Sequence, residues 1–212
     1  MISIRNKQDI MHLIHGPAGQ LEMQLSSPTG EPRQAWGIVC HPHPLHGGAM
    51  QNKVVTTIAK TFQHLGLTAV RFNFRGVGKS EGKFDKGYGE LDDLLSVIDW
   101  VLREKPQNEI WLAGFSFGAY VAAKAGTQIP VSKLVLVAPP VTHFHMESLP
   151  PLLTAWILVQ GDRDEVVPAE QVYAWAAERE PKPHIIRLPL ATHFFHGQLI
   201  ELRQQLESAL QG

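Results

Sequence analysis

Short hydrophobic runs alternate along this chain with longer stretches whose hydrophobic residues recur at helical spacing. From Trp36 onward, the hydrophobic runs are mostly continuous, which is typical of β-strands buried on both faces of a sheet. They comprise Trp36–Cys40, Thr68–Phe74, Glu109–Ala113, Lys133–Ala138, Trp156–Gln160 and His184–Leu188. The pattern therefore predicts a parallel sheet with both faces covered.

The stretches between these runs have the period of about 3.6 residues that marks amphipathic helices. They comprise Lys53–Leu65, Leu91–Glu104, Phe117–Gly126, Ala169–Glu178 and, after the last strand, Gln198–Leu210. Strict alternation of strand and helix predicts the α/β class, a mostly parallel twisted sheet with right-handed crossovers and helices on both faces. Functional residues of such a sheet lie in the loops at the carboxyl ends of its strands.

The first two hydrophobic segments follow a different pattern. Met11–His15 and Leu21–Leu25 flank the sequence G-P-A-G at residues 16–19, whose glycines and proline are typical of a turn. They predict a short antiparallel pair. Because no repeat, low-complexity segment or linker interrupts the chain, we expect residues 1–212 to form a single domain.

The composition is that of an ordinary globular protein and limits the classes of partner. Hydrophobic residues make up 44% of the chain, and 19 basic against 20 acidic residues leave a formal net charge of −1. Without a basic run, we expect neither a nucleic-acid nor a membrane partner. The single cysteine, Cys40, excludes an internal disulfide, and the polar stretch Met1–Ile10 lacks the apolar core of a signal peptide. We therefore expect a cytoplasmic protein.

A candidate nucleophile stands between a predicted strand and a predicted helix. The sequence G-F-S-F-G at Gly114–Gly118 centres on Ser116. In this context, G-x-S-x-G is typical of a nucleophile elbow, a strained turn that projects the serine hydroxyl above the sheet. The free N–H groups and the dipole of the helix N-terminus favour a developing oxyanion there. A serine that only caps the helix is the alternative, and partner residues downstream argue against it.

A serine hydroxyl needs a base, and a histidine base needs a carboxylate that fixes its tautomer. We predict Asp164 as the acid, because it stands in the loop a few residues beyond the end of a strand. Asp162, expected to cap the turn, and Glu165 are the alternatives. We predict His193 as the base, because it lies between the last strand and the last helix, whereas His196 is expected at the helix start. The chain order serine, aspartate, histidine fits a hydrolase built on an α/β sheet.

The loop after the first buried strand, His41–Gly48, holds three histidines. A second oxyanion donor is expected here, and His43 is the candidate because the prolines on both sides of it have no N–H group. Its partner is the N–H of Phe117, directly after Ser116. A metal site is the alternative, but neither cysteine nor carboxylate accompanies the histidines, so we expect no metal and no other cofactor. His41 is expected to pack in the interior.

One glycine-containing segment has partial similarity to nucleotide-binding motifs. The sequence G-K-S at residues 78–80 matches the end of a phosphate-binding loop, but Asn73 stands where its first glycine is required. The glycines at 76 and 78 match only half of a dinucleotide-binding fingerprint. We interpret this segment as a loop that leaves a strand, and we expect the neighbouring Asp92 and Asp93 on a solvated helix face.

Five segments together resemble the small bacterial α/β-hydrolases related to dienelactone hydrolases: residues 41–55, 71–78, 114–118, 161–168 and 193–195. The resemblance covers nearly the whole chain. It implies an α/β-hydrolase fold and a triad of Ser116, Asp164 and His193. Dienelactone hydrolases use a cysteine where this chain has a serine, so the resemblance suggests general hydrolysis of carboxylic esters.

We expect a serine hydrolase in which Ser116 attacks the carbonyl of a small-molecule ester, His193 transfers the proton and Asp164 orients His193. Thioesterases and acyltransferases are alternatives, because they use the same residues and differ only in the leaving group or the acceptor. A non-catalytic ligand-binding scaffold is a further alternative, although binding alone needs no base.

The segment between the strands Lys133–Ala138 and Trp156–Gln160 is too short for a folded lid and too rich in proline for helices. We therefore predict an open site without a lid. Phe144, Met146 and Leu149 are expected to line one side of its groove.

Overall fold

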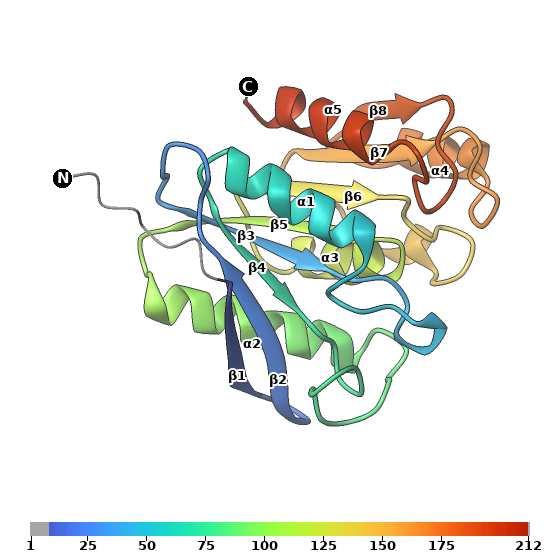
Figure 1. Cartoon of the computed structure of the whole chain (residues 1–212). Coiled ribbons are helices and arrows are strands. Elements are labelled where there is room, and N and C mark those ends of the chain that lie inside the picture. The colour runs from blue at the N-terminus through green and yellow to red at the C-terminus, as the bar shows by residue number, and fades with distance from the viewer. Residues whose placement is uncertain (1–8, 212) are drawn as a thin grey trace.

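The computed structural model describes residues 9–211, in which eight strands form one sheet between two layers of helices (Figure 1). Of the stretch Met1–Ile10 that argued against a signal peptide, only the last two residues belong to this described part. The strands are β1 (Ile10–Gly16), β2 (Gly19–Ser26), β3 (Ala35–Cys40), β4 (Thr68–Phe72), β5 (Glu109–Phe115), β6 (Lys133–Val137), β7 (Trp156–Gly161) and β8 (His184–Leu188). The helices are α1 (Lys53–His64), α2 (Gly89–Glu104), α3 (Phe117–Gly126), α4 (Ala169–Ala177) and α5 (Leu199–Gln211), with short 3-10 helices η1 (Pro44–His46) and η2 (Met146–Ser148).

The strands lie in the order β1-β2-β4-β3-β5-β6-β7-β8. All neighbouring pairs from β4 to β8 are parallel, while β1 and β2 form an antiparallel hairpin and β2 also pairs antiparallel with β4. Both the parallel sheet and the antiparallel pair that precedes it are thus confirmed. Two residues, Pro17 and Ala18, join the strands of the hairpin.

Two hydrophobic layers explain why the central strands are continuously apolar. Successive side chains of a strand point to opposite faces, and both faces are covered here. In β5, Leu112 packs in the layer of α2, α3 and α4, whereas Trp111 and Ala113 pack in the layer of α1 and α5. Figure 1 shows α1 and α5 in front of the sheet and α2 and α3 behind it.

Helix α1 illustrates how local sequence sets an element. The Asn52 side chain accepts hydrogen bonds from the N–H groups of Val54 and Val55 at 2.9 and 3.4 Å, which satisfies two free donors of the first turn. Val54, Ile58 and Phe62 then recur at four-residue spacing and are buried against the sheet.

Strand β4 is shorter than the predicted Thr68–Phe74. After Phe72, the Asn73 N–H donates to the Glu22 carbonyl and the Phe74 N–H donates to the ring of His41 at 3.0 Å. With these contacts, residues 73 and 74 no longer pair with β3, whose parallel register with β4 ends at Arg71. Phe74 is therefore apolar because it is buried in a loop, not because it pairs in the strand.

The connections around β3 place a crevice at the carboxyl end of the sheet. Helix α1 joins β3 to β4 on one face, and α2 then crosses from β4 to β5 on the other face, so β3 lies between β4 and β5. Ligands of α/β sheets bind where the strand order reverses in this way. The loops after β3 and β5, which contain His43 and Ser116, meet at this crevice.

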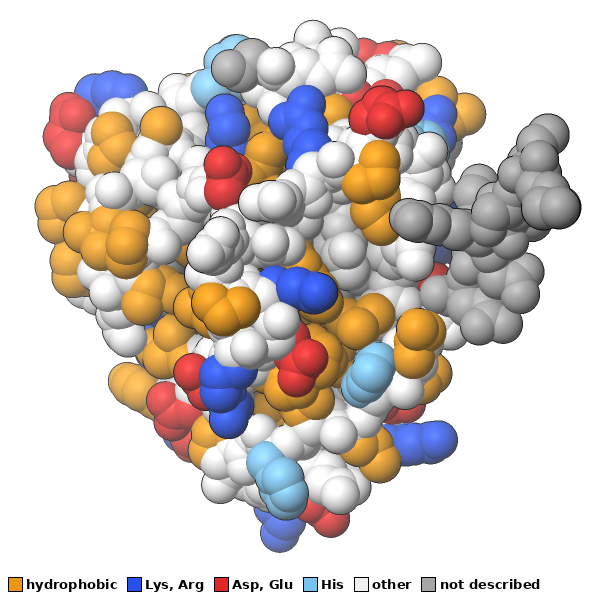
Figure 2. Space-filling model, turned by 90° about the vertical axis from the view of Figure 1, so that its left-hand side faces the viewer, with side chains coloured by type: hydrophobic (Ala, Val, Ile, Leu, Met, Phe, Trp, Pro, Cys, Tyr) orange, Lys and Arg blue, Asp and Glu red, His pale blue; other side chains and the backbone are white. Residues whose placement is uncertain are grey.

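The opposite end of the sheet, where the parallel strands begin, carries an apolar hollow of about 490 Å³ between α2 and the start of β5. Figure 2 views the molecule from this end and shows hydrophobic side chains interspersed with charged ones around its centre. None of Ser116, His193 and Asp164 lines this hollow. None of the helices in residues 9–211 combines the length and apolar character that a transmembrane span requires.

Candidate active site

Ser116 occupies a sharp turn between β5 and α3, with φ 53° and ψ −120°. This conformation is rare for a residue with a side chain, and a hydrogen bond from the Ser116 N–H to the Val137 carbonyl at 2.9 Å helps to hold it. A Cβ atom on Gly114 would lie 2.1 Å from the Gly118 carbonyl oxygen, and one on Gly118 would lie 2.4 Å from that of Cys40. Both glycines are therefore required by the close approach of α3 to the sheet.

His193 reaches Ser116 from the loop between β8 and α5. Its Nε2 lies 3.1 Å from the Ser116 Oγ, and its Nδ1 lies 2.8 Å from the Asp164 Oδ2. The His193 side chain is 3% exposed and the Asp164 side chain is 0% exposed. The structure thus brings together three predicted residues that are far apart in the sequence.

Asp164 is held as a carboxylate by the groups around it. Burial opposes its ionisation, but hydrogen bonds from His193 and from the N–H groups of Val167 and Val166 outweigh this effect, so the pKa of Asp164 lies below its ordinary value. The Gln160 amide donates to the same oxygen as His193, at 3.0 Å. A buried carboxylate beside Nδ1 favours the tautomer in which Nδ1 carries the proton and Nε2, beside the Ser116 Oγ, is free to accept a hydrogen bond.

The two alternative acids have other contacts. The Asp162 Oδ1 accepts hydrogen bonds from the Tyr173 hydroxyl at 2.7 Å and from Arg187 at 3.2 Å, so Asp162 links β7 to α4 and β8 through its side chain. The Glu165 Oε2 accepts the backbone N–H of His193 at 3.1 Å. Two successive acidic residues therefore hold His193, Asp164 by its ring and Glu165 by its backbone.

His196 was expected at the start of the last helix, and this is wrong. Helix α5 begins at Leu199, and His196 lies in the preceding turn, where its ring stacks on Phe194 with centroids 5.9 Å apart. The turn separates His196 from the contacts that His193 makes.

Two residues beside Ser116 have backbone N–H groups without an acceptor in the described part of the chain. Neither the His43 N–H nor the Phe117 N–H donates a hydrogen bond to another group of residues 9–211. Both residues line the same cavity as Ser116. The His43 ring is turned back on its own loop, where its Nδ1 accepts the Leu45 N–H at 3.2 Å. The arrangement leaves two donors available for an anionic oxygen.

His41 fixes the loop that carries His43. Its ring is fully buried, donates from Nδ1 to the Pro42 carbonyl at 2.7 Å and accepts the Phe74 N–H at Nε2. Because a carbonyl can only accept and an N–H can only donate, the contacts require the neutral Nδ1–H tautomer. Burial lowers the pKa of His41 to about 4, partly offset by the hydrogen bond to Pro42.

The remaining histidines of this loop pack against rings. His43 and His46 stack with centroids 4.3 Å apart, and His43 also contacts Phe84 and Phe117. Burial and the neighbouring His46 lower the pKa of His43. Within the described part of the chain, no three histidine, cysteine or acidic side chains gather as metal ligands do.

Two cavities flank Ser116. The first, of about 240 Å³, is called here the aromatic cavity, and its own lining includes Phe117, Pro140, His143, Phe144 and Val167. The second, of about 190 Å³, is called the glycine cavity, and its own lining includes Gly47, Gly48, Asn52, His193 and Phe194. His43, His46, Ser116 and Val166 line both. A substrate centred on Ser116 can therefore extend in two directions.

A family model described as "Serine aminopeptidase, S33" matches residues 43–158, more than half of the chain. An α/β serine hydrolase homologue from Coxiella burnetii is 52% identical and superposes with a TM-score of 0.93, covering 95% of this chain and 97% of the other. The chain belongs to this family of α/β serine hydrolases.

Two further relatives are similar to this hydrolase. A serine hydrolase from Xanthomonas campestris, described as lacking a lid, is 41% identical with a TM-score of 0.92, covering 96% of this chain and 94% of the other. An uncharacterized protein of Rickettsia prowazekii is 38% identical over 163 residues, 74% of this chain and 68% of that protein. The expected lidless α/β-hydrolase fold is confirmed, while a specific relation to dienelactone hydrolases stays a prediction.

The segment between β6 and β7 agrees with the absence of a lid in this part of the hydrolase. Residues 138–155 contain only the three-residue η2. The expectation that three of their side chains line a groove is correct only for Phe144, which lines the aromatic cavity. Met146 is fully buried in the core, and Leu149 packs against that core, because the proline-bounded segment folds inward against α4.

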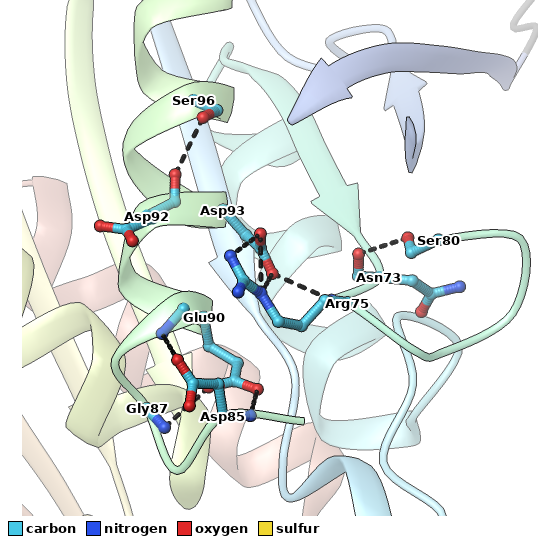
Figure 3. A network of polar contacts seen from close by, with 10 residues as sticks. Asn73, Arg75, Ser80, Asp85, Gly87, Glu90, Asp92, Asp93 and Ser96 are labelled. Carbon is cyan, nitrogen blue, oxygen red and sulfur yellow. Dashed lines mark hydrogen bonds and ion pairs between the residues drawn. The ribbon is translucent and has the colours of Figure 1, made fainter. Parts of the chain in front are cut away.

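The loop between β4 and α2 of the hydrolase is held by buried charges that the sequence did not reveal (Figure 3). Asp93 was expected on a solvated helix face, but its side chain is 0% exposed and forms an ion pair with Arg75 at 2.8 Å. Glu90, also buried, accepts the N–H groups of Asp85 and Gly87. Arg75, in the loop after β4, was the one sequence signal for the burial of Asp93. A cation in a loop can neutralise an acidic residue on the following helix, here eighteen positions later.

This loop supports the candidate site. It carries Phe84, whose ring centroid lies 4.8 Å from that of His43 and 5.6 Å from that of Phe117. The buried Glu90, which accepts the N–H of the neighbouring Asp85 at 2.8 Å, thereby holds the segment whose Phe84 ring packs against both residues of the predicted oxyanion donors.

Proposed function

We propose that this α/β serine hydrolase is a carboxylic-ester hydrolase that works through an acyl-enzyme on Ser116. The observation that carries the proposal is the continuous hydrogen-bonded series from the Ser116 Oγ through His193 to Asp164. At its Ser116 end lie His43 and Phe117, whose backbone N–H groups have no acceptor within residues 9–211. Binding alone would require neither a base nor a buried acid, which disfavours a non-catalytic scaffold.

The proposed reaction begins when His193 Nε2 takes the Ser116 proton as the Oγ attacks the ester carbonyl. The carbonyl oxygen becomes an anion, which the N–H groups of His43 and Phe117 stabilise by hydrogen bonds. Asp164 stabilises the imidazolium that forms. His193 then donates its proton to the alcohol oxygen as the C–O bond breaks, and the alcohol leaves.

Water completes the turnover. His193 removes a proton from the water as it attacks the acyl carbon, and returns a proton to the Ser116 Oγ as the acid leaves. Thioester cleavage and acyl transfer would use the same steps with a different leaving group or acceptor. We propose an ester as the substrate because a departing alcohol needs the proton that His193, beside the Ser116 Oγ, can supply, whereas a thiol leaves readily without one.

The lining of the cavities argues against cleavage of a peptide with a free amino-terminus. Such a substrate carries an ammonium group close to the scissile bond, and an acidic side chain is the usual partner for it. Neither cavity at Ser116 is lined by an aspartate or glutamate. Glu165, the acidic residue next to Asp164, points its Oε2 at the His193 backbone.

Replacement of Ser116 by alanine tests the proposal. Ser116→Ala is expected to lose ester hydrolysis almost completely and to unfold at the same urea concentration as the parent protein, because it removes the nucleophile alone. A fluorophosphonate probe is expected to label Ser116, and His193→Ala is expected to abolish labelling. Undiminished hydrolysis by Ser116→Ala, or a probe adduct on another serine, would contradict the proposal.

A further inference from the structure

The two cavities at Ser116 differ in their relation to the predicted general acid. His193 lines the glycine cavity and does not line the aromatic cavity. In ester cleavage, the proton that the histidine takes from the serine goes to the oxygen of the departing alcohol. The alcohol must therefore lie on the His193 side of Ser116, in the glycine cavity. The acyl group then extends into the aromatic cavity.

The aromatic cavity has a firm apolar wall. The Phe144 ring stacks on Tyr120 with centroids 5.0 Å apart and lies 5.2 Å from Phe117. Phe117 is itself 1% exposed and packs against Phe74. A wall of rings supported by other rings favours a flat or branched apolar group over a polar one.

The volumes limit the size of the two groups. An apolar cavity of roughly 150 Å³ holds a benzene molecule, so the 240 Å³ of the aromatic cavity suits one ring with a short carbon arm. The glycine cavity, of 190 Å³, is smaller and has the polar side chain of Asn52 and the backbone of Gly47 and Gly48 in its wall. It suits a small alcohol.

The charge of the lining limits the substrate further. No lysine, arginine, aspartate or glutamate lines either cavity. A carboxylate or an ammonium group on the acyl arm would lose water in the aromatic cavity and would meet only the imidazole rings of His43, His46 and His143 there, with no lysine, arginine or acidic side chain. The lining therefore favours an uncharged acyl group.

We propose that the hydrolase prefers uncharged esters in which a compact acyl group, of the size of one ring with a short arm, is joined to a small alcohol. This inference rests on the proposed ester hydrolysis. In each turnover, a bond forms between the Ser116 Oγ and the acyl carbon, the bond from that carbon to the alcohol oxygen breaks, and His193 supplies the alcohol proton.

Two isomeric esters test the direction of binding. Methyl 3-phenylpropanoate and 2-phenylethyl acetate have the same atoms, with the ring on the acyl side in the first and on the alcohol side in the second. After each rate is divided by that of hydroxide-catalysed hydrolysis of the same ester, kcat/KM is expected to be at least tenfold higher for methyl 3-phenylpropanoate. Monomethyl succinate is expected to fall at least a hundredfold below dimethyl succinate, because only the former carries a charge on its acyl arm.

Two phenylalanine variants separate the cavities. Phe144→Ala, which opens the aromatic cavity, is expected to lower the preference for methyl 3-phenylpropanoate at least fivefold. Phe194→Ala, which alters the glycine cavity, is expected to keep this preference and to change the relative rates of methyl and butyl esters instead. Circular dichroism of both variants identifies any loss of fold.

The outcomes distinguish the two proposals. An equal or reversed preference between the isomers, with hydrolysis that disappears in Ser116→Ala, overturns the assignment of the cavities and leaves the ester hydrolase in place. Hydrolysis of no ester above the level of Ser116→Ala overturns the proposed function, and the assignment with it. A preference for methyl 3-phenylpropanoate that Phe144→Ala reduces supports both.

Discussion

Replacement of His41 by glutamine is expected to make the stability of the fold less dependent on pH. The ring of His41 is fully buried, and its Nε2 accepts the Phe74 N–H at 3.0 Å. A protonated ring has no lone pair for this contact and would bring an unpaired charge into the core. Burial accordingly lowers the pKa of His41 from 6.5 to about 4.

The sign and size of the effect follow from this difference in pKa. The unfolded chain binds the His41 proton more tightly than the folded chain, so acid favours unfolding. The contribution is intact above pH 6.5 and is lost progressively as the pH falls toward 4. One pKa unit corresponds to about 1.4 kcal/mol. Protonation of His41 is therefore expected to lower the free energy of unfolding by about 2 kcal/mol when the pH falls from 7 to 5.

The assay is urea unfolding of the parent protein and of His41→Gln at pH 7 and pH 5. Glutamine offers an amide N–H for the Pro42 carbonyl and an oxygen for the Phe74 N–H, and it does not titrate. His184→Gln, at an exposed histidine in β8, is the matched control. The drop in stability from pH 7 to pH 5 should shrink by about 2 kcal/mol in His41→Gln and remain unchanged in the control. An equal drop in all three proteins would refute the reasoning.

Two further predictions concern the candidate site. Asp164→Asn is expected to lower kcat by about 10³–10⁴-fold, because asparagine disfavours the required tautomer of His193. Asp162→Asn, which weakens a partly exposed ion pair with Arg187 outside the candidate site, is expected to change kcat less than about threefold. Equal losses of kcat in steady-state assays of the two variants would contradict the assignment of Asp164 as the acid that orients His193. The hydrolase is also expected to show no interfacial activation, because residues 138–155 form no cover that must open. A sharp rise in rate as an ester passes its solubility limit would contradict an open site.

The sequence determined the framework of the fold and the candidate nucleophile because both depend on local features. Continuous apolar runs separated by helical stretches specify a parallel sheet, since each strand must be buried on both faces. The glycines around Ser116 are local as well, because the tight turn between β5 and α3 leaves no room for a Cβ atom at Gly114 or Gly118. Parallel strands end at the same edge, so the loops that hold Asp164 and His193 were expected to meet there.

Tertiary structure decided which neighbouring side chains meet. Asp162, Asp164 and Glu165 share one loop, and their contacts differ because the chain turns between them: Asp162 faces Arg187 on β8, whereas Asp164 faces the His193 ring. The sequence cannot show which of these acidic residues meets His193, because that contact depends on where loops distant in the sequence lie in space.

The burial of Asp93 and the two cavities also came from the tertiary structure alone. Asp93 has the sequence context of an exposed helical residue and becomes buried because Arg75, in the loop after β4, reaches it at 2.8 Å. The cavities lie between loops that follow different strands, and their shapes depend on the packing of rings such as Phe144 on Tyr120. Periodicity records which face of an element is buried, but the space left between packed loops is set only when all of them are in place.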